Sequence, residues 1–329
     1  MVGGNTQFRT FSSLTENDLN LRAGVVYRLK DDWEEISRLR FGYTGRIIND
    51  DFKQTEYNMI TLNGPSFTSV DDISLDDFYS AAHFNDRFTL DNAVDKYTVK
   101  KNIHSVYAEA VYQFTRHWVI NLGLKYDNVD MTVDYNVDKG NSKGKNNIRK
   151  NYFLPSLNMR YRLNDKNALR LGLRKTYTLP QSKEISPYRY VGVYFKSQGN
   201  ANLKPSDNYN IDLKWDFNPT STELISVTAF YKMIKNPISR IETPSAGGFL
   251  SYENVADQAT VMGIELEIRK KIFSRPTANN GMNRLTAGLN GSYIYTNAKV
   301  NDPDIAATDT DGSQLEGAAP WIANFDLSH

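Results

Sequence analysis

The feature that most constrains this chain is a strict alternation of apolar and polar residues over stretches of about ten residues. In NYNIDLKWDF, from Asn208 to Phe217, the odd positions are apolar or aromatic and the even positions are amides, carboxylates and one lysine. Successive side chains of a β-strand point to opposite sides, so a period of two predicts a strand with one apolar and one wet face. The apolar face must meet either a protein core or lipid.

The same alternation recurs along the chain and predicts an all-β fold of about eleven strands, with little helix. Several of these stretches reach ten residues, which is longer than the usual strand of a soluble domain. A propeller would repeat with a fixed period, and the chain has none. The predicted strands cover 19–30, 36–46, 106–114, 118–126, 157–163, 169–173, 208–217, 223–233, 262–268, 285–295 and 321–327.

Short and long connections alternate between these strands. The short ones are at 29–35, 115–117, 163–167, 218–223 and, somewhat longer, 270–283, and the long ones are at 47–103, 130–151, 178–207, 234–259 and 298–319. Long loops are unusual in compact soluble domains. A sheet with its short turns at one edge and its long loops at the other is typical of an outer-membrane barrel. We therefore predict an antiparallel transmembrane β-barrel segment with short periplasmic turns and long extracellular loops.

Composition fits this prediction and excludes several classes of function. The mean hydropathy is −0.55, as expected where only every second residue of a strand must be apolar. No run of about 18 apolar residues marks a transmembrane helix, and the opening MVGGNTQFRTF has no signal-peptide pattern, so we expect a mature segment. A net charge of +1 gives no reason to expect nucleic acid, and the absence of cysteine removes disulfides and thiolate sites.

No set of residues predicts catalysis. The four histidines are scattered, and the chain contains neither the zinc motif HExxH, nor a nucleophile elbow, nor a phosphate-binding loop. We expect no enzyme activity and no cofactor.

Carboxylates cluster in two long loops, and one of these loops is a candidate for binding a cation. In DTDGSQLEG the carboxylates of Asp309, Asp311 and Glu316 are the hard oxygen ligands that Ca²⁺ prefers. The spacing of a full calcium loop is not met, so a solvated loop is the simpler interpretation. The other acidic loop holds Asp71, Asp72, Asp76 and Asp77.

Four stretches resemble one family, the TonB-dependent outer-membrane receptors, and RLRFGYTGR (38–46) together with the TEND segment near Thr15 resembles its Bacteroidetes-type members. The four stretches are RKTYTLPQSKEISPYRYV (174–191), GNANLKPSDNYNIDLKWDF (199–217), ISVTAFYKMIKNPISRI (225–241) and NVADQATVMGIELEIRKKI (254–272). They occur in the family's order and spacing, and the resemblance covers 150–329 well and the first half loosely. The chain departs from the family pattern at Ala201, Asn202 and Ser206.

The resemblance implies about half of a barrel of about 22 strands. On this basis residues 1–329 are part of a receptor barrel domain without the plug domain or the C-terminal strands. Such a receptor imports a scarce nutrient, namely a siderophore-bound metal, a glycan or a peptide. The expected partners are the TonB complex, reached through an N-terminal segment absent here, and outer-membrane lipid, with a surface lipoprotein as a further candidate. The expected location is the outer membrane.

Four aromatic residues in the loop before the 199–217 stretch are the substrate-binding candidates, namely Tyr188, Tyr190, Tyr194 and Phe195. They could stack on a sugar or an aromatic siderophore, or they could pack the loop against its neighbours, which we favour. The basic run KGNSKGKNNIRK (139–150) is predicted to be an extracellular tip that meets solvent or anionic lipopolysaccharide.

Two other functions are compatible with the residues. A passive outer-membrane porin or adhesin barrel would share the strand pattern, and a soluble β-rich binding module would share the alternation. A plug and a TonB-box segment in the same gene would favour the receptor.

Three features have a structural interpretation. Pro205 is placed to start a strand, Gly263 marks a bulge or a close backbone approach, and Asn236-Pro237 marks a turn. In Asn208–Phe217 we expect the odd side to face lipid, with Trp215 and Phe217 near the periplasmic end.

Overall fold

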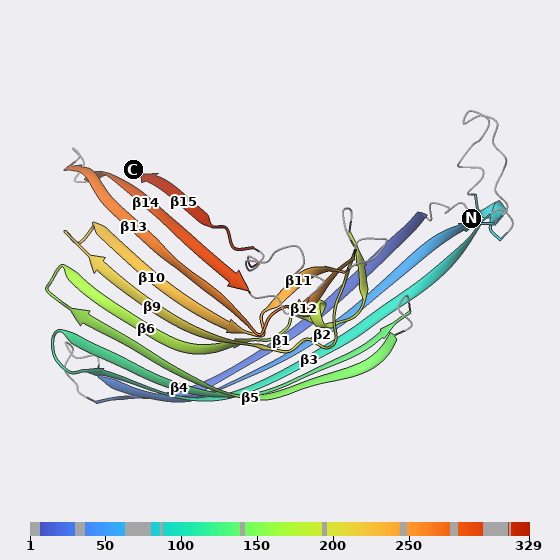
Figure 1. Cartoon of the computed structure of the whole chain (residues 1–329), viewed down its shortest axis with the longest axis horizontal. Helices are drawn as coiled ribbons and strands as arrows, with labels where there is room; N and C mark the ends of the chain where they lie inside the picture. Colours follow the sequence, from blue (N-terminus) through green and yellow to red (C-terminus); the bar gives the residue numbers. More distant parts are fainter. Residues whose placement is uncertain are drawn as a thin grey trace.

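The chain forms one strongly curved antiparallel sheet that is open along one side, like a trough (Figure 1). A computed structural model describes residues 7–29, 37–62, 80–85, 88–138, 142–192, 196–243, 249–276, 282–298, 315 and 317–329. Eleven strands pair in the order β1-β2-β3-β4-β5-β6-β9-β10-β13-β14-β15. Their bounds are Gln7–Arg28, Arg38–Thr61, Phe88–Gln113, Trp118–Val137, Ser142–Arg162, Asn167–Thr178, Ser206–Phe217, Leu224–Lys235, Gln258–Pro276, Met282–Ala298 and Trp321–Ser328.

These observations confirm the predicted fold class. Each strand of the large sheet pairs with the next large-sheet strand along the chain, as in half of a barrel wall. Helix is limited to the four-residue α2 (Ser182–Ile185) and the three-residue 3₁₀ helix η2 (Ala81–His83) within the described residues. None of the described helices is long and apolar enough to cross a membrane.

The outer face of the sheet carries an apolar belt. Tyr43, Val106, Tyr126 and Phe153 occupy one row across β2, β3, β4 and β5 and form its upper edge. Trp118 and Tyr161, whose ring centroids are 4.3 Å apart, form its lower edge beside the short turns. The eight steps from Trp118 to Tyr126, at about 3.3 Å each and tilted by about 40°, span roughly 20 Å, close to the apolar band of outer-membrane barrels.

The predicted face assignment of β9 follows the same belt. Ile211 and Leu213, on its odd side, are 46% and 52% exposed, whereas Asn208, Asn210 and Asp216 on its even side are buried. Trp215 and Phe217 lie at the end next to the short turn 218–223. The apolar side of the strand therefore points outward and its polar side points into the trough.

Above the belt, the polarity of the strands is inverted. The outer face becomes polar, where Asn128 donates to Asn151 at 2.8 Å and Arg149 pairs with Asp130 at 2.9 Å. The inner face becomes buried and mainly apolar, with Val99, Val129, Met131, Val133 and Val137, and it also buries Asp50 and Asp95. We call the parts of β2–β5 beyond the Tyr43–Phe153 row (45–62, 88–104, 128–138 and 142–151) the tower.

The predicted long connections 47–103 and 130–151 are therefore wrong. β2 continues to Thr61, β3 begins at Phe88, β4 continues to Val137 and β5 begins at Ser142. The basic run 139–150 is a strand from residue 142 onward and not a tip. The pattern overestimates the length of these connections because the apolar side chains change faces at the tower, so the alternation changes phase although the strands continue.

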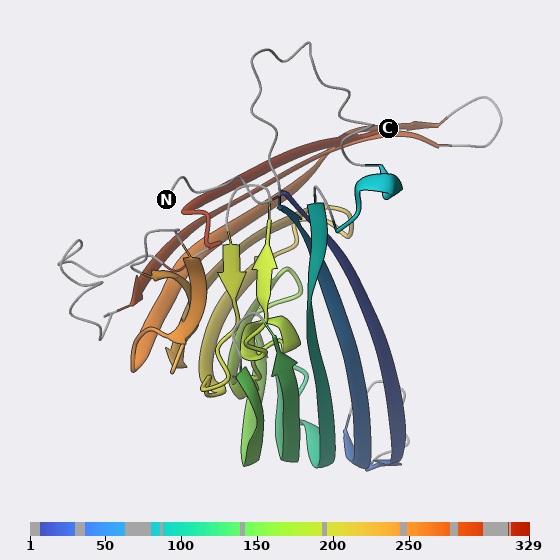
Figure 2. The same ribbon diagram turned by 90° about the vertical axis from the view of Figure 1, so that its right-hand side faces the viewer.

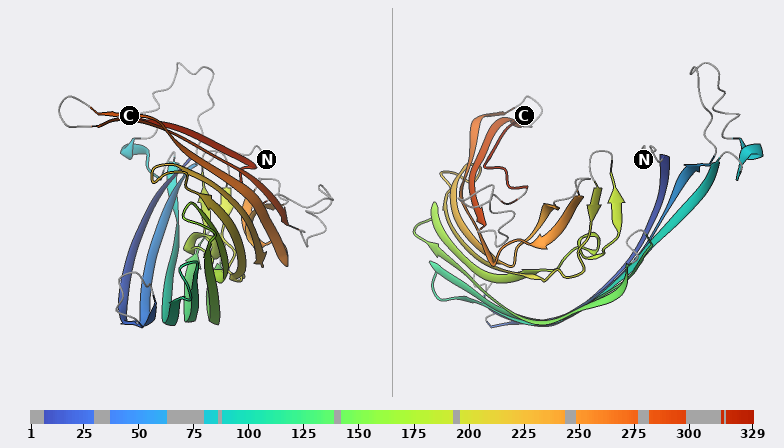
Figure 3. Two further views of the ribbon diagram at one scale, coloured as in Figure 1. Left: turned by 90° about the vertical axis from the view of Figure 1, so that its left-hand side faces the viewer. Right: turned by 45° about the vertical axis from the view of Figure 1, so that its right-hand side comes forward.

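The tower is covered from inside by what we call the loop module, residues 179–192, 196–205, 236–243 and 249–257. It holds a second, four-stranded sheet in the order β11-β12-β8-β7, with bounds Ile238–Thr243, Phe249–Asn254, Lys196–Gln198 and Arg189–Val191. Figures 2 and 3 show these strands on the concave side of the large sheet. Ile185, Tyr188 and Leu203 of the module pack against Tyr97 and Met131 of the tower to form the core.

The predictions for single residues have mixed outcomes. Pro205 directly precedes β9, and Asn236 adopts a left-handed turn conformation with φ 50°, so both are confirmed. At Gly263 the alternative of close approach is correct, because a Cβ there would lie 2.7 Å from the Phe230 ring. The bulge of this ladder lies further along β13, between Lys271 and Phe273.

The large sheet is split between β5 and β6. Their ladder runs only from Arg162↔Ala168 to Ser156↔Arg174, although both strands continue. Pro155, which has no N–H to donate, lies next to the last pair. Beyond this fork the outer side of β6 lies against the inner side of β4 and β5.

Candidate functional site in the concave wall

The concave wall presents polar and charged side chains from every large strand at belt height. Buried polar residues there include Ser105, Asp127, Asn210, Asp216 and Ser226. Each is on the side opposite to an outward apolar neighbour, because successive residues of a strand alternate faces. The wall can therefore bind polar groups, unlike the belt on its other side.

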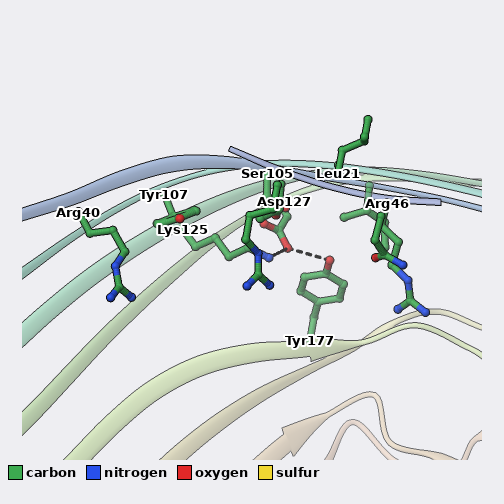
Figure 4. Close-up of a pocket in the computed structure, with 13 residues that line it drawn as sticks. Leu21, Arg40, Arg46, Ser105, Tyr107, Lys125, Asp127 and Tyr177 are labelled. Carbon is green, nitrogen blue, oxygen red and sulfur yellow. Dashed lines mark hydrogen bonds and ion pairs between the residues drawn. The ribbon is translucent and has the colours of Figure 1, made fainter. Parts of the chain in front are cut away.

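One cavity of about 720 Å³ concentrates cations on this wall. Arg22, Arg40, Arg46 and Lys125 line it from β1, β2 and β4, and Asp127 is the one carboxylate among its described lining residues. In Figure 4 the side chains of Arg40, Arg46 and Lys125 extend from the sheet into the concave space, whereas Leu21 points away. The lining thus carries a positive excess.

A buried carboxylate anchors one side of the cavity. Asp127 is 1% exposed and accepts hydrogen bonds through Oδ2 from Lys125 at 2.8 Å and from the Tyr177 hydroxyl at 2.9 Å. The Tyr177 ring stacks on Tyr152 at 3.8 Å between centroids. Because Tyr177 comes from β6 and Asp127 from β4, these contacts join the two layers beyond the fork.

The arginines are held by carboxylates on neighbouring strands. Arg40 donates to Glu109 at 3.1 Å, and Asn121 donates to the other oxygen of that carboxylate at 2.9 Å. Arg46 donates to Asp18 at 2.7 Å. These pairs fix the guanidinium groups while leaving other N–H donors for a ligand.

A glycine shapes the floor of the cavity. Tyr107 crosses the neighbouring strand at Gly42, where a Cβ would lie 2.5 Å from the phenol Cζ. Only glycine allows the ring to lie flat across β2 at this point.

The chemistry of this cavity is recognition of anionic or oxygen-rich groups. Guanidinium and ammonium donors bind carboxylate, phosphate and other anionic oxygens. Within the part of the chain that the structure describes, no group of three or more His, Asp or Glu side chains could hold a metal ion.

The predicted substrate-binding aromatics are in different environments. Tyr188 is buried in the module core, with ring centroids 4.6 Å from Phe52 and 5.3 Å from Tyr97, and burial raises its pKa. Tyr190 is 40% exposed, and Lys183 Nζ lies 4.3 Å from its ring centroid. Tyr194 and Phe195 lie outside the described residues. A ligand-binding role for these four remains a prediction.

The calcium candidates Asp309, Asp311 and Glu316 also lie outside the described residues, as do Asp71, Asp72, Asp76 and Asp77. The cations of the concave cavity were not singled out from the sequence. Arg40, Arg46 and Lys125 occupy the polar phase of their strands, which identifies a face but gives no reason to choose these residues over others on it.

A protein-family model described as "TonB dependent receptor-like, beta-barrel" matches residues 3–329 of the chain. No curated protein matches the chain.

Solved structures with the same fold are at low sequence identity. The ferric yersiniabactin uptake receptor FyuA from Yersinia pestis is 14% identical with a TM-score of 0.59, covering 98% of this chain and 41% of that one. The siderophore receptor PiuA from Acinetobacter baumannii is 13% identical with a TM-score of 0.59, covering 96% and 44%. The ferric citrate transporter FecA is 11% identical with a TM-score of 0.57, covering 98% and 41%. The chain thus spans less than half the length of these structures.

Proposed function

Because the chain belongs to the TonB dependent receptor-like β-barrel family, we propose that it forms about half of the wall of a receptor that imports a scarce nutrient. The barrels of this family lie in the bacterial outer membrane, and so does this chain. In our proposal residues 1–329 are part of one barrel domain, and a plug domain and further strands complete the receptor. Family membership removes the soluble β-rich module as an alternative and favours a receptor over a passive porin or adhesin.

The observation that carries the proposal is the division of the wall into three surfaces. The outer belt is apolar and matches lipid, the concave wall at the same height is polar, and the tower above is polar outside and packed inside. This is the division that an importer requires, with a lipid-facing outside, a hydrophilic path and an extracellular capture region.

We propose a siderophore-bound metal as the first candidate ligand, with a glycan or a peptide as alternatives. The cation-lined cavity supports an anionic, oxygen-rich ligand. Two of the similar structures, a ferric yersiniabactin uptake receptor and a ferric citrate transporter, support the same class of cargo.

The proposed partners are the TonB complex, which would supply energy through a segment outside this chain, and outer-membrane lipid. A surface lipoprotein is a further candidate. We assign the chain no catalytic step, because the charged residues of the concave wall form ion pairs and hydrogen bonds suited to binding.

Uptake in the native host tests this proposal. Cells lacking the gene should lose energy-dependent accumulation of radiolabelled iron or copper chelates, and cells lacking TonB should show the same loss. Replacing Arg40 and Lys125 with glutamine should weaken uptake. The outward Arg149→Gln, in a comparable ion pair on the tower, is the matched control and should not affect it. Accumulation that survives loss of TonB would contradict the proposal.

A further inference from the structure

The lipid-facing side of the sheet has an apolar hollow at the fork between β5 and β6. This groove, about 720 Å³ in volume, is lined on one side by Phe41, Leu124 and Pro155 and on the other by Leu173 and Ile211. All five belong to the outward apolar face, so the groove opens into the hydrocarbon region of the membrane.

Two features of the sequence create this groove. Ala108 and Ala110 of β3 place small side chains in the belt between larger residues of β2 and β4. Beyond the pair Ser156↔Arg174, the β5–β6 ladder stops, and β6 steps inward behind Pro155. An apolar chain that entered this step would regain packing contacts that an empty groove lacks.

The upper end of the groove is cationic. Tyr209, which lines it, has Lys175 Nζ 5.4 Å and Lys235 Nζ 5.7 Å from its ring centroid. Asp207 is the nearby carboxylate, 3.0 Å from Lys150 and 3.5 Å from Lys175. Two lysines thus pair with this aspartate, and Lys235, which is opposite Asp207 in the β9–β10 ladder, is exposed.

We propose that this groove binds one phosphorylated glycolipid of the outer leaflet, with an acyl chain in the hollow and a phosphate at Lys175 and Lys235. The two lysines lie at the end of β6 and β10 away from the short turns 163–166 and 218–223. Given the outer-membrane location, that end faces the outside, where the leaflet is built of glycolipid that carries phosphates on its sugar headgroup. Lysine stems lie along apolar surface while the ammonium reaches a headgroup, which matches an amphiphile with both parts.

Native mass spectrometry of the detergent-purified protein tests the proposal, with diphosphoryl lipid A as the probe. At about a factor of five per lysine near an anionic headgroup, the double variant Lys175→Gln/Lys235→Gln should bind this lipid about 30-fold more weakly. Lys232→Gln, on the lumen side of β10, is the matched control and should bind as the wild type does. Lys175→Arg/Lys235→Arg should restore binding, which separates loss of charge from loss of fold.

Two further experiments test the role of the groove and the identity of the lipid. Ala110→Phe should fill the hollow and weaken binding with the lysines intact. Lipid A without phosphates should bind weakly to wild type and double variant alike. Equal binding of diphosphoryl lipid A to wild type and double variant would overturn the site, and phosphatidylglycerol bound as tightly as lipid A would overturn its assignment to glycolipid.

Discussion

The two halves of β4 compare the same secondary structure in two surroundings. From Trp118 to Tyr126 the outward residues are apolar and the inward ones include Asn121 and Lys125, whereas from Asn128 to Val137 the inward residues are apolar and the outward ones polar. The backbone ladder to β3 and β5 continues through the change without a register shift. The backbone pairing is therefore the same in both halves, and the apolar face is the one that lipid or the loop module covers.

The cover on each apolar face explains the difference. The lower half meets lipid outside, so Leu122 and Leu124 are exposed in the isolated chain. The upper half is covered inside by the loop module, so Met131 and Val133 are fully buried by protein. A charged substitution in β4 should therefore be costly on the outer face below the Tyr126–Asp127 boundary and on the inner face above it.

The largest effect is expected in the covered core of the tower. Met131→Asp buries an unpaired charge at a fully buried position and should destabilise the module by on the order of 4 kcal/mol. Thr132→Asp, the next residue on the outer polar face, should change stability by less than about 0.5 kcal/mol. Limited proteolysis of residues 179–205 measures both, and equal cleavage of the two variants would contradict the assigned faces.

The next effect belongs to the belt. Leu122→Arg places a cation on the lipid side at mid-height and should cost about 2–4 kcal/mol in a lipid-inserted barrel. Leu213→Arg on β9 should behave similarly. Thr132→Arg has the same outward orientation as Leu122 but lies on the tower, so it should be nearly neutral. Guanidinium unfolding in lipid vesicles, followed by tryptophan fluorescence, distinguishes them, and a tolerated Leu122→Arg would argue against lipid contact.

A smaller effect is expected from Gly199→Ala in the loop module. A Cβ at this position would overlap the carbonyl oxygen of Ser186 and lie 2.7 Å from that of Lys183. The backbone must shift, at a cost of about 1–3 kcal/mol. Gly172→Ala in β6 is the control, because its Cβ would meet neighbours only at ordinary contact distance, 3.5 Å or more. Thermal unfolding monitored by protease sensitivity should rank Gly199→Ala well below Gly172→Ala.

The smallest effect appears only at alkaline pH. Burial, with the nearby Asp50 charge, raises the pKa of Tyr97 to about 12, above the ordinary tyrosine value of 10.0. The folded tower thus binds this proton more tightly than the unfolded chain does, so the associated stability is complete below pH 10 and is lost as the pH rises toward 12. Tyr97→Phe should remove this pH dependence. Phenolate absorbance during alkaline titration measures it, and ionisation of Tyr97 near pH 10 would refute the burial.

Much of the belt could be predicted from sequence, but the tower could not. Ile211, Leu213 and Trp215 alternate with polar residues over one medium, so local periodicity is sufficient to assign their faces. Val129, Met131 and Val133 alternate equally well, but their cover, Ile185 and Leu203, is distant in sequence. In the sequence, a change of phase in the apolar–polar alternation therefore looks like the end of a strand unless the segment that covers the other face is known.

Prediction of the candidate site from the sequence has the same limit. The polar phase of each strand contains Arg40 and Lys125, but which cations converge depends on the register between strands, which a single sequence does not determine. The sequence identifies Tyr188 as an aromatic residue in a loop and favours packing for it. Its burial against Tyr97 depends on the tower, whose extent the sequence pattern did not indicate.

The pairing of β8 with β12 has a consequence for how this protein can diverge. Lys196 and Ser197 pair in parallel with Phe249 and Leu250, Asn200 donates to the Tyr252 carbonyl at 2.9 Å, and Asn254 donates to the Lys204 carbonyl at 2.9 Å. The two surface connections that meet there share one hydrogen-bond network although about fifty residues separate them. Selection by phage or antibody on one connection would therefore constrain the other, and a chimera should exchange both segments together.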